Sequence, residues 1–456
     1  MKQMIKYWKP VFDNDNTALA PEVWAQEALM ILENNMIMSN LVYRDFENEI
    51  ATYGDTVNAH RPNSFVAQRK VDGVDVIVQD ARATNVPVKL DQHLHVSFMI
   101  YDGEESKSFK DLVDLYLRPA LIAEAQGLDQ VVGGQVYDFL GNSVGQLGTP
   151  LSKSSVVAAN EQLNKQKCPL AGRNMVVSPD AEGDLLDLGE FTKVNETGTP
   201  EGLVNANLGT KFNFKFFMDQ NTPSVPTGST VQAATVTNAA GVGATVIVLG
   251  GLSTYQPLVG SWITMVGDMT PQLILTASAV GAGASTITIA PGLKSPVVGS
   301  GSAAAIYVPG AVNYGPGYAS GYNLPLVVDG FTVSPKLGQM ISINGSNYSA
   351  MSTPTTTQLL LNRSLDNSAA NNAVVGVGPA GNYSFGFHRN AVALVVRPLA
   401  APRAGTGALS YVANYNGLSV RVTITYNGLK QGHLVTVDML AGVKTLDTNL
   451  GVVMLS

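Results

Sequence analysis

The sequence has little charge, a single cysteine and no long hydrophobic run. Charged residues make up 14% of its 456 residues, against roughly 25% in an average soluble domain. The lone Cys168 excludes an internal disulfide framework, so synthesis in the cytosol is the default. No segment approaches the ~18 apolar residues of a membrane span, and the first residues lack the apolar core of a signal peptide. We therefore expect a soluble protein that does not bind a membrane.

A basic stripe is also missing. The formal net charge is −7 and the pI is about 5.3, which argues against binding nucleic acid through a broad basic face. The charge is unevenly distributed: residues 1–220 hold 49 of the 63 charged residues, whereas residues 221–345 hold four. These four are Asp268, Lys294, Asp329 and Lys336. The middle stretch therefore indicates a separate module.

The N-terminal part alternates between helical and strand patterns. Residues 1–20 are polar and irregular, and Pro21 opens a segment with apolar residues at helical spacing. Residues 55–100 change to period two, with Asp72-Gly73 as a hairpin signal, which predicts a long, exposed β-hairpin. Such a hairpin has little core of its own and needs a neighbour to rest on. Its charged residues are Arg61, Arg69, Lys70, Asp72, Asp75, Asp80 and Arg82.

Helix signals follow the hairpin. Ser108 to Gln126 has an N-cap candidate, an apolar side and a terminating Gly127, and Pro119 is expected to kink or split this helix. Further elements are expected as a helix at 152–166, a strand at 174–178 and an acidic helix at 179–190.

The middle stretch is strand material with a weak internal repeat. Residues 241–252 resemble 281–293, and residues 260–267 are echoed at 338–345. Short strands with Gly and Pro turns predict a small sandwich or barrel. Strand-like phrases then return at 387–399, 418–426 and 434–440, which favours a module inserted into a larger discontinuous domain.

Two glycine motifs suggest chemistry. Gly141-Asn-Ser-Val-Gly145 matches a nucleophile elbow, but Gly148 and Pro150 follow where a helix would have to begin, so an ordinary loop is favoured over a catalytic Ser143. Residues 376–381 match a dinucleotide-binding G-x-G-x-x-G, but a strand pattern follows and Pro379 lies inside, so a turn is favoured.

Other candidate residues are equally weak. His93 and His95 share one strand face beside Asp91, a spacing that a metal could use, but a solvated polar face is favoured. Cys168 is more typical of a packed small residue than of a nucleophile. The acid pairs Glu104–Glu105 and Asp184–Asp187 fit solvated helix ends and faces. We therefore expect no catalytic, cofactor-binding or metal-binding residue and no cofactor, and a structural or assembly role is favoured over an enzyme.

Several phrases, together and in order, carry a family resemblance. They are residues 117–125 with Leu128-Asp129, residues 168–179, residues 209–223, residues 387–394 and residues 417–422. The sequence resembles the major capsid proteins of tailed bacteriophages, which have the Hong Kong 97-like fold, in the branch with an extra β-rich insertion domain.

The resemblance implies an α+β fold and a division of the chain. The parts are an N-terminal arm (1–20), an N-terminal helix region (21–54), an extended hairpin loop with the following strand (55–100), the spine helix and first part of the axial domain (101–223), the β-rich insertion (224–384, or ending near 345) and the returning core strands (385–456). It also implies that the seven hairpin charges contact neighbouring subunits.

The implied function is self-assembly into pentamers and hexamers of an icosahedral phage head that encloses double-stranded DNA without reading its sequence. A scaffolding protein and a portal are implied partners, with a decoration protein as a further option, and the locations are the virion and, during assembly, the host cytoplasm. Two alternatives stay open: the shell protein of a bacterial cargo compartment, and a surface-layer or adhesin-type structural protein. A hydrolase would require a reactive Ser143.

Overall fold

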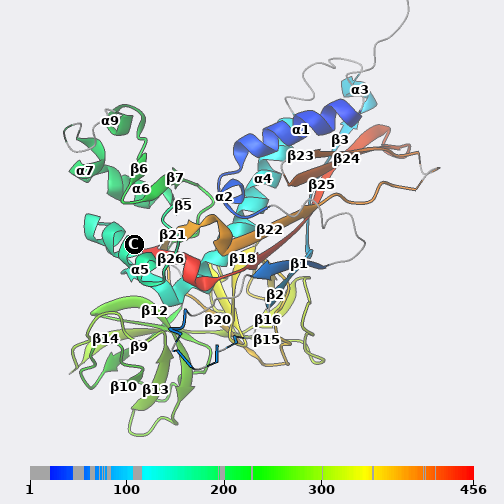
Figure 1. The fold of residues 1–456 in the computed structure, drawn as a ribbon. Coiled ribbons are helices and arrows are strands. Elements are labelled where there is room, and N and C mark those ends of the chain that lie inside the picture. The colour runs from blue at the N-terminus through cyan, green and yellow to red at the C-terminus, as the bar shows by residue number, and fades with distance from the viewer. Residues whose placement is uncertain are drawn as a thin grey trace, which may run out of the picture. The chain divides into compact units, whose positions relative to one another are not determined.

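The computed structural model describes the chain as two compact units (Figure 1). Unit 1 comprises residues up to Asn35, His93–Ala125 and Arg397–Leu440, and unit 2 comprises Met36–Gln92, Gln126–Val396 and Ala441–Ser456. The described residues are 21–44, 56–61, 67–70, 72–73, 75–76, 78–79, 84–105, 116–193, 195, 201–226, 230–299, 301–351, 354–403, 405, 407–415 and 417–456. The expected arm, residues 1–20, lies outside them. The element content confirms a mixed α+β, strand-rich protein.

Unit 1 is a helix packed on an antiparallel sheet. In this sheet β24 lies between β23 and β25, and β3 pairs with β25. The strands are β3 (Gln92–Tyr101), β23 (Leu409–Tyr415), β24 (Leu418–Asn427) and β25 (Gly432–Thr445), and a short helix α3 (Asp102–Glu105) follows β3. From Ala441 onward β25 belongs to unit 2. Helix α1 (Pro21–Asn35) lies against β23 and β24 and buries Ala25, Ala28 and Leu32, which recur at helical spacing. The predicted helix after Pro21 is therefore confirmed.

Unit 2 contains a second, mixed sheet. Its strand order is β4-β26-β21-β5-β7-β6, with β8 paired to β21. The strands are β4 (Ser143–Gly145), β5 (Arg173–Val177), β6 (Thr210–Lys211), β7 (Phe214–Met218), β8 (Ser224–Val225), β21 (Gly381–His388) and β26 (Gly451–Leu455). The remaining short elements of unit 2 are α2 (Met38–Leu41), α7 (Gly189–Thr192), α9 (Glu201–Asn205), η4 (Arg389–Ala391), β22 (Val392–Arg397) and η5 (Thr448–Leu450).

Two serine caps define the helices beside this sheet. Helix α5 (Lys153–Lys165) begins after Ser152, whose side chain accepts a hydrogen bond from the Ser155 amide. Helix α6 (Pro179–Leu186) begins after Ser178, which caps it in the same way. These elements confirm the predicted helix, strand and acidic helix, although the acidic helix ends at Leu186 and α7 is separate from it.

The helix predicted at 108–126 is wrong at its end, and its predicted start lies outside the described residues. The structure has α4 (Arg118–Gly133), which runs into a 3₁₀ helix, η3 (Gly134–Asn142), whereas residues 106–115 lie outside the described residues. Pro119 is in the first turn of α4, where its missing N–H costs nothing, and residues 116–117 before it form a π-helical turn. The helix continues through Gly127 because Leu128 and the valines that follow it are completely buried.

Residues 231–377 fold into two closed, six-stranded antiparallel barrels, coloured green and yellow in Figure 1. The first barrel consists of β9 (Val231–Val236), β10 (Val246–Gly250), β11 (Trp262–Met265), β12 (Asp268–Ala277), β13 (Ser285–Ala290) and β14 (Ser302–Tyr307). The second barrel consists of β15 (Gly310–Val312), β16 (Leu326–Asp329), β17 (Met340–Ile343), β18 (Ser346–Met351), β19 (Gln358–Leu361) and β20 (Val374–Val377).

The two barrels have the same topology. Around the first barrel the strands follow the order β9-β10-β13-β12-β11-β14, and around the second they follow β15-β16-β19-β18-β17-β20. Each strand of the first barrel therefore has a counterpart in the second at the same place in the chain order. The prediction of one small sandwich or barrel is wrong in number, and the chain holds the same barrel twice.

The sequence repeat marks this duplication. Residues 260–267 cover β11 and its turn, and residues 338–345 cover the corresponding strand β17 and its turn. Gly267 and Gly345 both have positive φ, +104° and +81°, which the tight turns after these strands require. The other predicted repeat, residues 241–252 and 281–293, lies within the first barrel. Its two copies contain β10 and β13, which pair with each other. Residue 345, one expected end of the β-rich stretch, therefore lies inside the second barrel.

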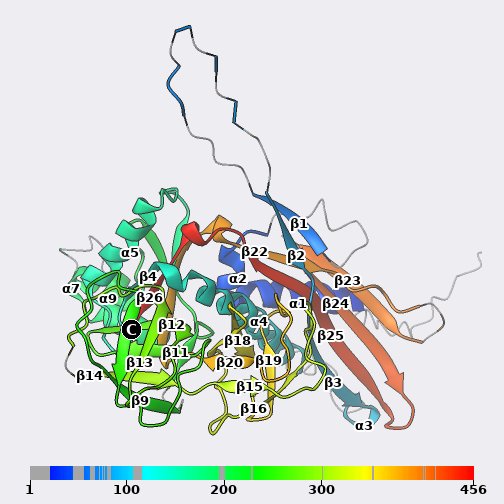
Figure 2. The same cartoon turned by 90° about the horizontal axis from the view of Figure 1, so that it is seen from below.

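The predicted hairpin is confirmed at its base. Strands β1 (Thr56–Arg61) and β2 (Thr84–Lys89) pair antiparallel in register from Thr56 with Lys89 to Arg61 with Thr84 (Figure 2). Val57 and Val88 face each other and are buried, and the neighbouring Asn58 is exposed, as period two predicts. Asp72 and Gly73 form a turn between the two strands.

Candidate functional site

The charged hairpin residues are in part open to solvent. Arg69, Lys70, Asp72 and Asp75 are all exposed. Arg61 is the last residue of β1, and the predicted contacts Asp80 and Arg82 lie outside the described residues. Two aliphatic side chains in this segment, Val76 and Val78, are 70% and 87% exposed. The segment thus presents charge and apolar surface to solvent rather than to the chain's own core.

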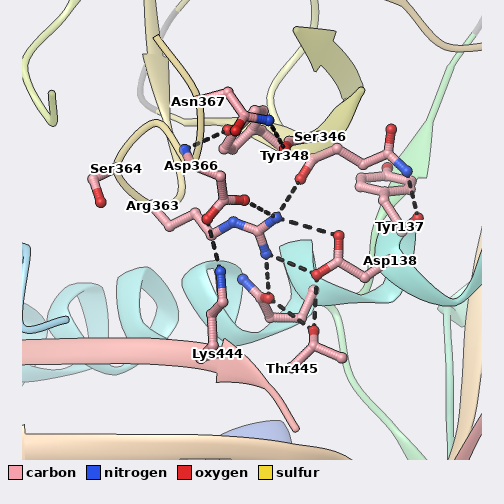
Figure 3. Close-up of polar contacts among 12 residues, drawn as sticks. Tyr137, Asp138, Ser346, Tyr348, Arg363, Ser364, Asp366, Asn367, Lys444 and Thr445 are labelled. Carbon is pink, nitrogen blue, oxygen red and sulfur yellow. Dashed lines mark hydrogen bonds and ion pairs between the residues drawn. The ribbon is translucent and has the colours of Figure 1, made fainter. Parts of the chain in front are cut away.

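A buried ionic cluster joins the second barrel to the rest of unit 2 (Figure 3). Its centre is Arg363, whose side chain is only 6% exposed. Nη1 lies 2.8 Å from Oδ2 of Asp138 and donates to Oε1 of Gln135 at 2.6 Å. Nη2 lies 3.1 Å from Oδ2 of Asp366 and donates to the Asn347 carbonyl at 2.9 Å. One guanidinium therefore connects η3 with the segments on either side of β19.

The end of β25 completes the cluster. Lys444 Nζ lies 2.7 Å from Oδ1 of Asp366, and the Thr445 hydroxyl donates to Oδ2 of Asp138 at 2.8 Å. The Arg363 guanidinium also lies 5.1 Å from the centre of the Tyr348 ring, within cation–π range. Two acids are thus matched by two bases, so the buried charge of Arg363 and the partly buried charges around it are compensated.

The pKa of Asp366 shows this compensation. Burial alone would raise the pKa of Asp366, but the charges of Arg363 and Lys444 and their hydrogen bonds hold it below its ordinary value. The carboxylate is therefore ionised at neutral pH and attracts both cations.

Neutral hydrogen bonds surround the cluster. Asn362 donates to the Val131 carbonyl at 3.2 Å and accepts from the Ser349 amide at 3.0 Å. A side chain at Gly134 would place Cβ 2.4 Å from Asn362 Nδ2, so glycine is required there for this close approach. The Tyr137 hydroxyl donates to the Gly338 carbonyl at 2.6 Å. The second barrel is therefore fixed to α4 and η3 over a continuous polar contact.

The first barrel is attached differently. The Trp262 indole donates to the Ser342 hydroxyl of the second barrel at 3.0 Å, and that hydroxyl donates to the Gly260 carbonyl at 3.0 Å. Lys294 Nζ donates to the Gly141 carbonyl of η3 at 2.8 Å. The acceptors of these bonds are a hydroxyl and two backbone carbonyls. The first barrel is thus held without an ion pair at these points.

The one acid of the first barrel is buried inside it. Asp268 is completely buried, and its carboxylate accepts from the Thr270 hydroxyl at 2.6 Å and from the Lys294 amide at 2.6 Å. The Gln272 amide and the Ser295 backbone N–H also donate to it, at 3.2 Å and 3.3 Å. This acid therefore organises the barrel's own turns and contributes no charge to its surface.

Two further acids in α4 are buried. Glu124 in unit 1 is 2% exposed, and neither carboxylate oxygen has a hydrogen-bond partner among the described residues. Burial, together with the charge of Asp438, raises the pKa of Glu124 to about 8. Because its pKa is raised, the neutral acid fits the fold, and ionisation costs stability as the pH rises from about 4.5, the ordinary value for glutamate, to about 8.

Asp129 in unit 2 positions the chain before α2. Its carboxylate accepts from the Ile37 and Ser39 amides at 2.8 Å each. Burial and the nearby charge of Asp219 raise the pKa of Asp129 to about 6, although the hydrogen bonds from the Ile37 and Ser39 amides oppose this shift. Both acids are 1–2% exposed, so this pair shapes the fold rather than a site open to substrate.

The two glycine motifs occupy strands and turns. Ser143 begins β4, is 5% exposed and is followed by strand rather than by a helix. Residues 376–381 cover the end of β20 and the start of β21. A Cβ at Gly376 would lie 2.1 Å from the Gly260 carbonyl oxygen, so its glycine serves packing between the barrels.

The remaining candidates do not form a constellation. The rings of His93 and His95 are 6.0 Å apart, and His93 Nε2 lies 3.8 Å from Asp438, which is already paired with Arg421. Cys168 is buried, and burial raises the pKa of its thiol. Among the described residues, no group of three or more His, Cys, Asp and Glu side chains is placed to hold a metal ion. No described helix is long and apolar enough to span a membrane.

Sequence reasoning missed the ionic cluster. Asp138 and Arg363 are 225 residues apart, so no local spacing connects them. The only signal in the sequence that could have pointed to this cluster is compositional. Arg363 and Asp366 are the first charged residues after Lys336 in a long charge-poor stretch. A charge retained there indicates a specific partner.

No protein-family model and no curated protein matches the sequence. Chains of solved phage structures are similar to it over most of its length. One from Mycobacterium phage Che8 is 13% identical with a TM-score of 0.43, over 92% of this chain and 90% of that chain. A chain of the capsid structure of the Cyanophage P-SCSP1u is 10% identical with a TM-score of 0.43, over 92% of this chain and 88% of that chain. A chain of the mature capsid of bacteriophage PhiM1 is 8% identical with a TM-score of 0.39, over 88% of this chain and 82% of that chain. Because these identities and TM-scores are low, the likeness assigns no function by itself.

Proposed function

We propose that the chain is a major capsid protein of a tailed bacteriophage, a structural subunit that assembles into the pentamers and hexamers of an icosahedral head around double-stranded DNA. The observation that carries this proposal is the hairpin of β1 and β2. It is a two-stranded sheet whose intervening described residues expose charged and apolar side chains, including Arg69 and Val78. A hairpin with no core of its own requires another surface, and a second copy of the chain supplies one.

The acidic composition supports enclosure rather than binding of DNA. A net charge of −7, with 35 acidic residues against 28 basic ones, disfavours a broad basic face that would neutralise many phosphates. In this proposal the two barrels are the inserted module within 224–384, and the sheets of the two units belong to the capsid core. The partners are further copies, a scaffolding protein, a portal and, as an option, a decoration protein, and the locations are the host cytoplasm and then the virion.

The test is assembly of the purified full-length chain, alone and with the scaffolding protein encoded beside it. Electron microscopy is expected to show closed shells, most efficiently with the scaffold. Only monomers under both conditions would contradict the proposal. Shells that package an enzyme instead of DNA would favour the cargo-compartment alternative, and flat sheets would favour a surface layer.

A charge reversal in the hairpin tests the interface. Changing Arg69 and Lys70 to Glu is expected to reduce shell yield at least fivefold, because the exposed charges lose their partners on the neighbouring subunit. The matched control is Lys336→Glu, which reverses an exposed charge on the second barrel. Circular dichroism should show both variants folded. Unchanged yield in the double variant would remove the hairpin from the interface.

A further inference from the structure

The second barrel touches the base of the hairpin at three points. Lys89, the last residue of β2, donates from Nζ to the Gly321 carbonyl at 3.1 Å. Asn323 donates from its side chain to the Asp91 carbonyl at 3.0 Å. The Ser364 amide donates to Oδ2 of Asp91 at 2.6 Å. All of these residues belong to unit 2, and two separate loops of the barrel are involved.

Strand β25 also holds the hairpin base. Gly442 of β25 lies so close that a Cβ there would be 2.2 Å from the Lys89 carbonyl oxygen and 3.1 Å from the Leu90 Cα. Val88 and Leu90 are buried, at 0% and 6% exposure. The residues that end β2 therefore contact both the barrel loops and β25, and only a residue without a side chain at position 442 permits this approach.

The barrel contact is itself immobilised by the ionic cluster. Ser364 directly follows Arg363, whose guanidinium is fixed by Asp138 and Asp366. The amide that holds Asp91 is therefore joined through one peptide unit to the most strongly bonded side chain of this region. Contacts run without a gap from η3 through Arg363 and Ser364 to Asp91 and β2.

We propose that the second barrel sets the direction of the hairpin, with Asp91 as the positioning residue. A two-stranded hairpin has too little core to fix its own orientation. Gly73 is eleven residues from Thr84 and can reach at most ~40 Å from it, so a rotation of about 10° at the base moves the tip by about 7 Å. Its consequence for assembly rests on the proposed capsid function, whereas the positioning itself is a property of the single chain.

The experiment compares Asp91→Ala, Asp91→Asn and the control Lys336→Met in the full-length chain. Hydrogen–deuterium exchange of the β1 and β2 amides is measured before assembly, and shell yield is measured afterwards by electron microscopy. Asp91→Ala is expected to raise exchange in these strands about tenfold and to lower shell yield at least fivefold. Asp91→Asn keeps an oxygen that accepts from Ser364 and is expected to stay within threefold of the wild type, as is Lys336→Met.

Unchanged exchange of β1 and β2 in Asp91→Ala would overturn the proposal, whatever the shell yield. If the wild type forms no shells, the capsid function fails, and the exchange measurement still decides the positioning role. If Asp91→Ala also loosens the barrel strands, Asn323→Ala provides the second test, since it removes only a surface bond to the Asp91 carbonyl. Raised exchange confined to β1 and β2 in that variant supports the proposal, and exchange unchanged there contradicts it.

Discussion

The two barrels share one topology and differ in how they are fastened. The second barrel contributes Arg363 and Asp366 to a buried ionic cluster with Asp138 and Lys444. The first barrel is held at Trp262 and Lys294 by bonds to a hydroxyl and to a carbonyl. The same strand order thus accommodates one attachment by ion pairs and another by hydrogen bonds to uncharged acceptors.

This difference shows that topology and attachment are separate properties of the module. The repeated phrase governs strands β11 and β17 and their turns, so it encodes the barrel. The ion pairs of the second barrel involve residues outside the phrase, in the turn after β19 and in η3, whereas Trp262 and Ser342, which join the two barrels, lie within it. Buried ion pairs add directional geometry at the expense of desolvation, whereas a bond between uncharged groups, such as that of Trp262 to Ser342, involves a smaller desolvation cost.

The largest expected effect is at Arg363. Changing Arg363 to Met leaves the partly buried carboxylate of Asp138 without its cation and is expected to lower the free energy of unfolding by about 3 kcal/mol, the lower end of the range for a buried pair. Urea denaturation measures the change, with Lys336→Met as the control. Adding Asp138→Asn to Arg363→Met should recover part of the loss. A loss below about 1 kcal/mol would mean that the second barrel is not held by ion pairing.

A smaller and more local effect is expected at Asp268. Changing Asp268 to Ala leaves the donors of Thr270 and Lys294 unsatisfied inside the first barrel and is expected to cost about 2–3 kcal/mol. Hydrogen exchange should rise in β11 to β14 and stay unchanged in β15 to β20. Equal loosening of both barrels would show that they unfold together, and the contrast between them would lose its meaning.

The contact between the barrels is expected to be weaker still. Changing Ser342 to Ala removes the acceptor of the buried Trp262 N–H and should cost about 1–2 kcal/mol. The measurement is urea denaturation followed by tryptophan fluorescence. The control is Ser346→Ala, a partly exposed serine of β18. An effect as large as that of Arg363→Met would mean that the neutral attachment is as strong as the ionic one.

The smallest effect is a pH dependence of the second barrel. The folded-state pKa of Asp366 is below its ordinary value of 3.8, so its stabilisation is complete above that value and is lost as the pH falls through the folded pKa. Because the carboxylate is partly solvated and screened, we expect up to about 1 kcal/mol. Exchange in β18 and β19 should increase below about pH 4, and Asp366→Asn should abolish this increase. The same acid dependence in Asp366→Asn would assign it to other carboxylates.

Local features of the fold could be predicted from the sequence. The alternation through Val86 and Val88 predicts strand, and the serines at 152 and 178 predict the starts of two helices. These signals work because each depends on neighbours a few residues away. The end predicted for helix α4 is wrong because it follows the propensity of Gly127 to terminate a helix, whereas burial of the residues that follow decides its extent.

Non-local features could not be predicted. The first barrel closes where β9 pairs with β14, with Val231 opposite Tyr307. No sequence pattern in either strand identifies the other as its partner. The repeat at 260–267 and 338–345 is visible in the sequence. Because it covers only one strand of each barrel, it does not show whether the two strands belong to one barrel or to two. The ionic cluster escapes prediction for the same reason, since its four charged residues come from three distant parts of the chain.

Closure of the strands has a consequence for solubility. The first barrel exposes aliphatic side chains such as Val242 and Val298, at 68% and 73%, and has almost no charge with which copies could repel one another. An open sheet of this composition would add strands of other molecules along its free edges and aggregate. In each barrel every strand has two neighbours, so no edge is left for such growth. Ring closure therefore protects these barrels from aggregation in the way that surface charge protects most soluble proteins.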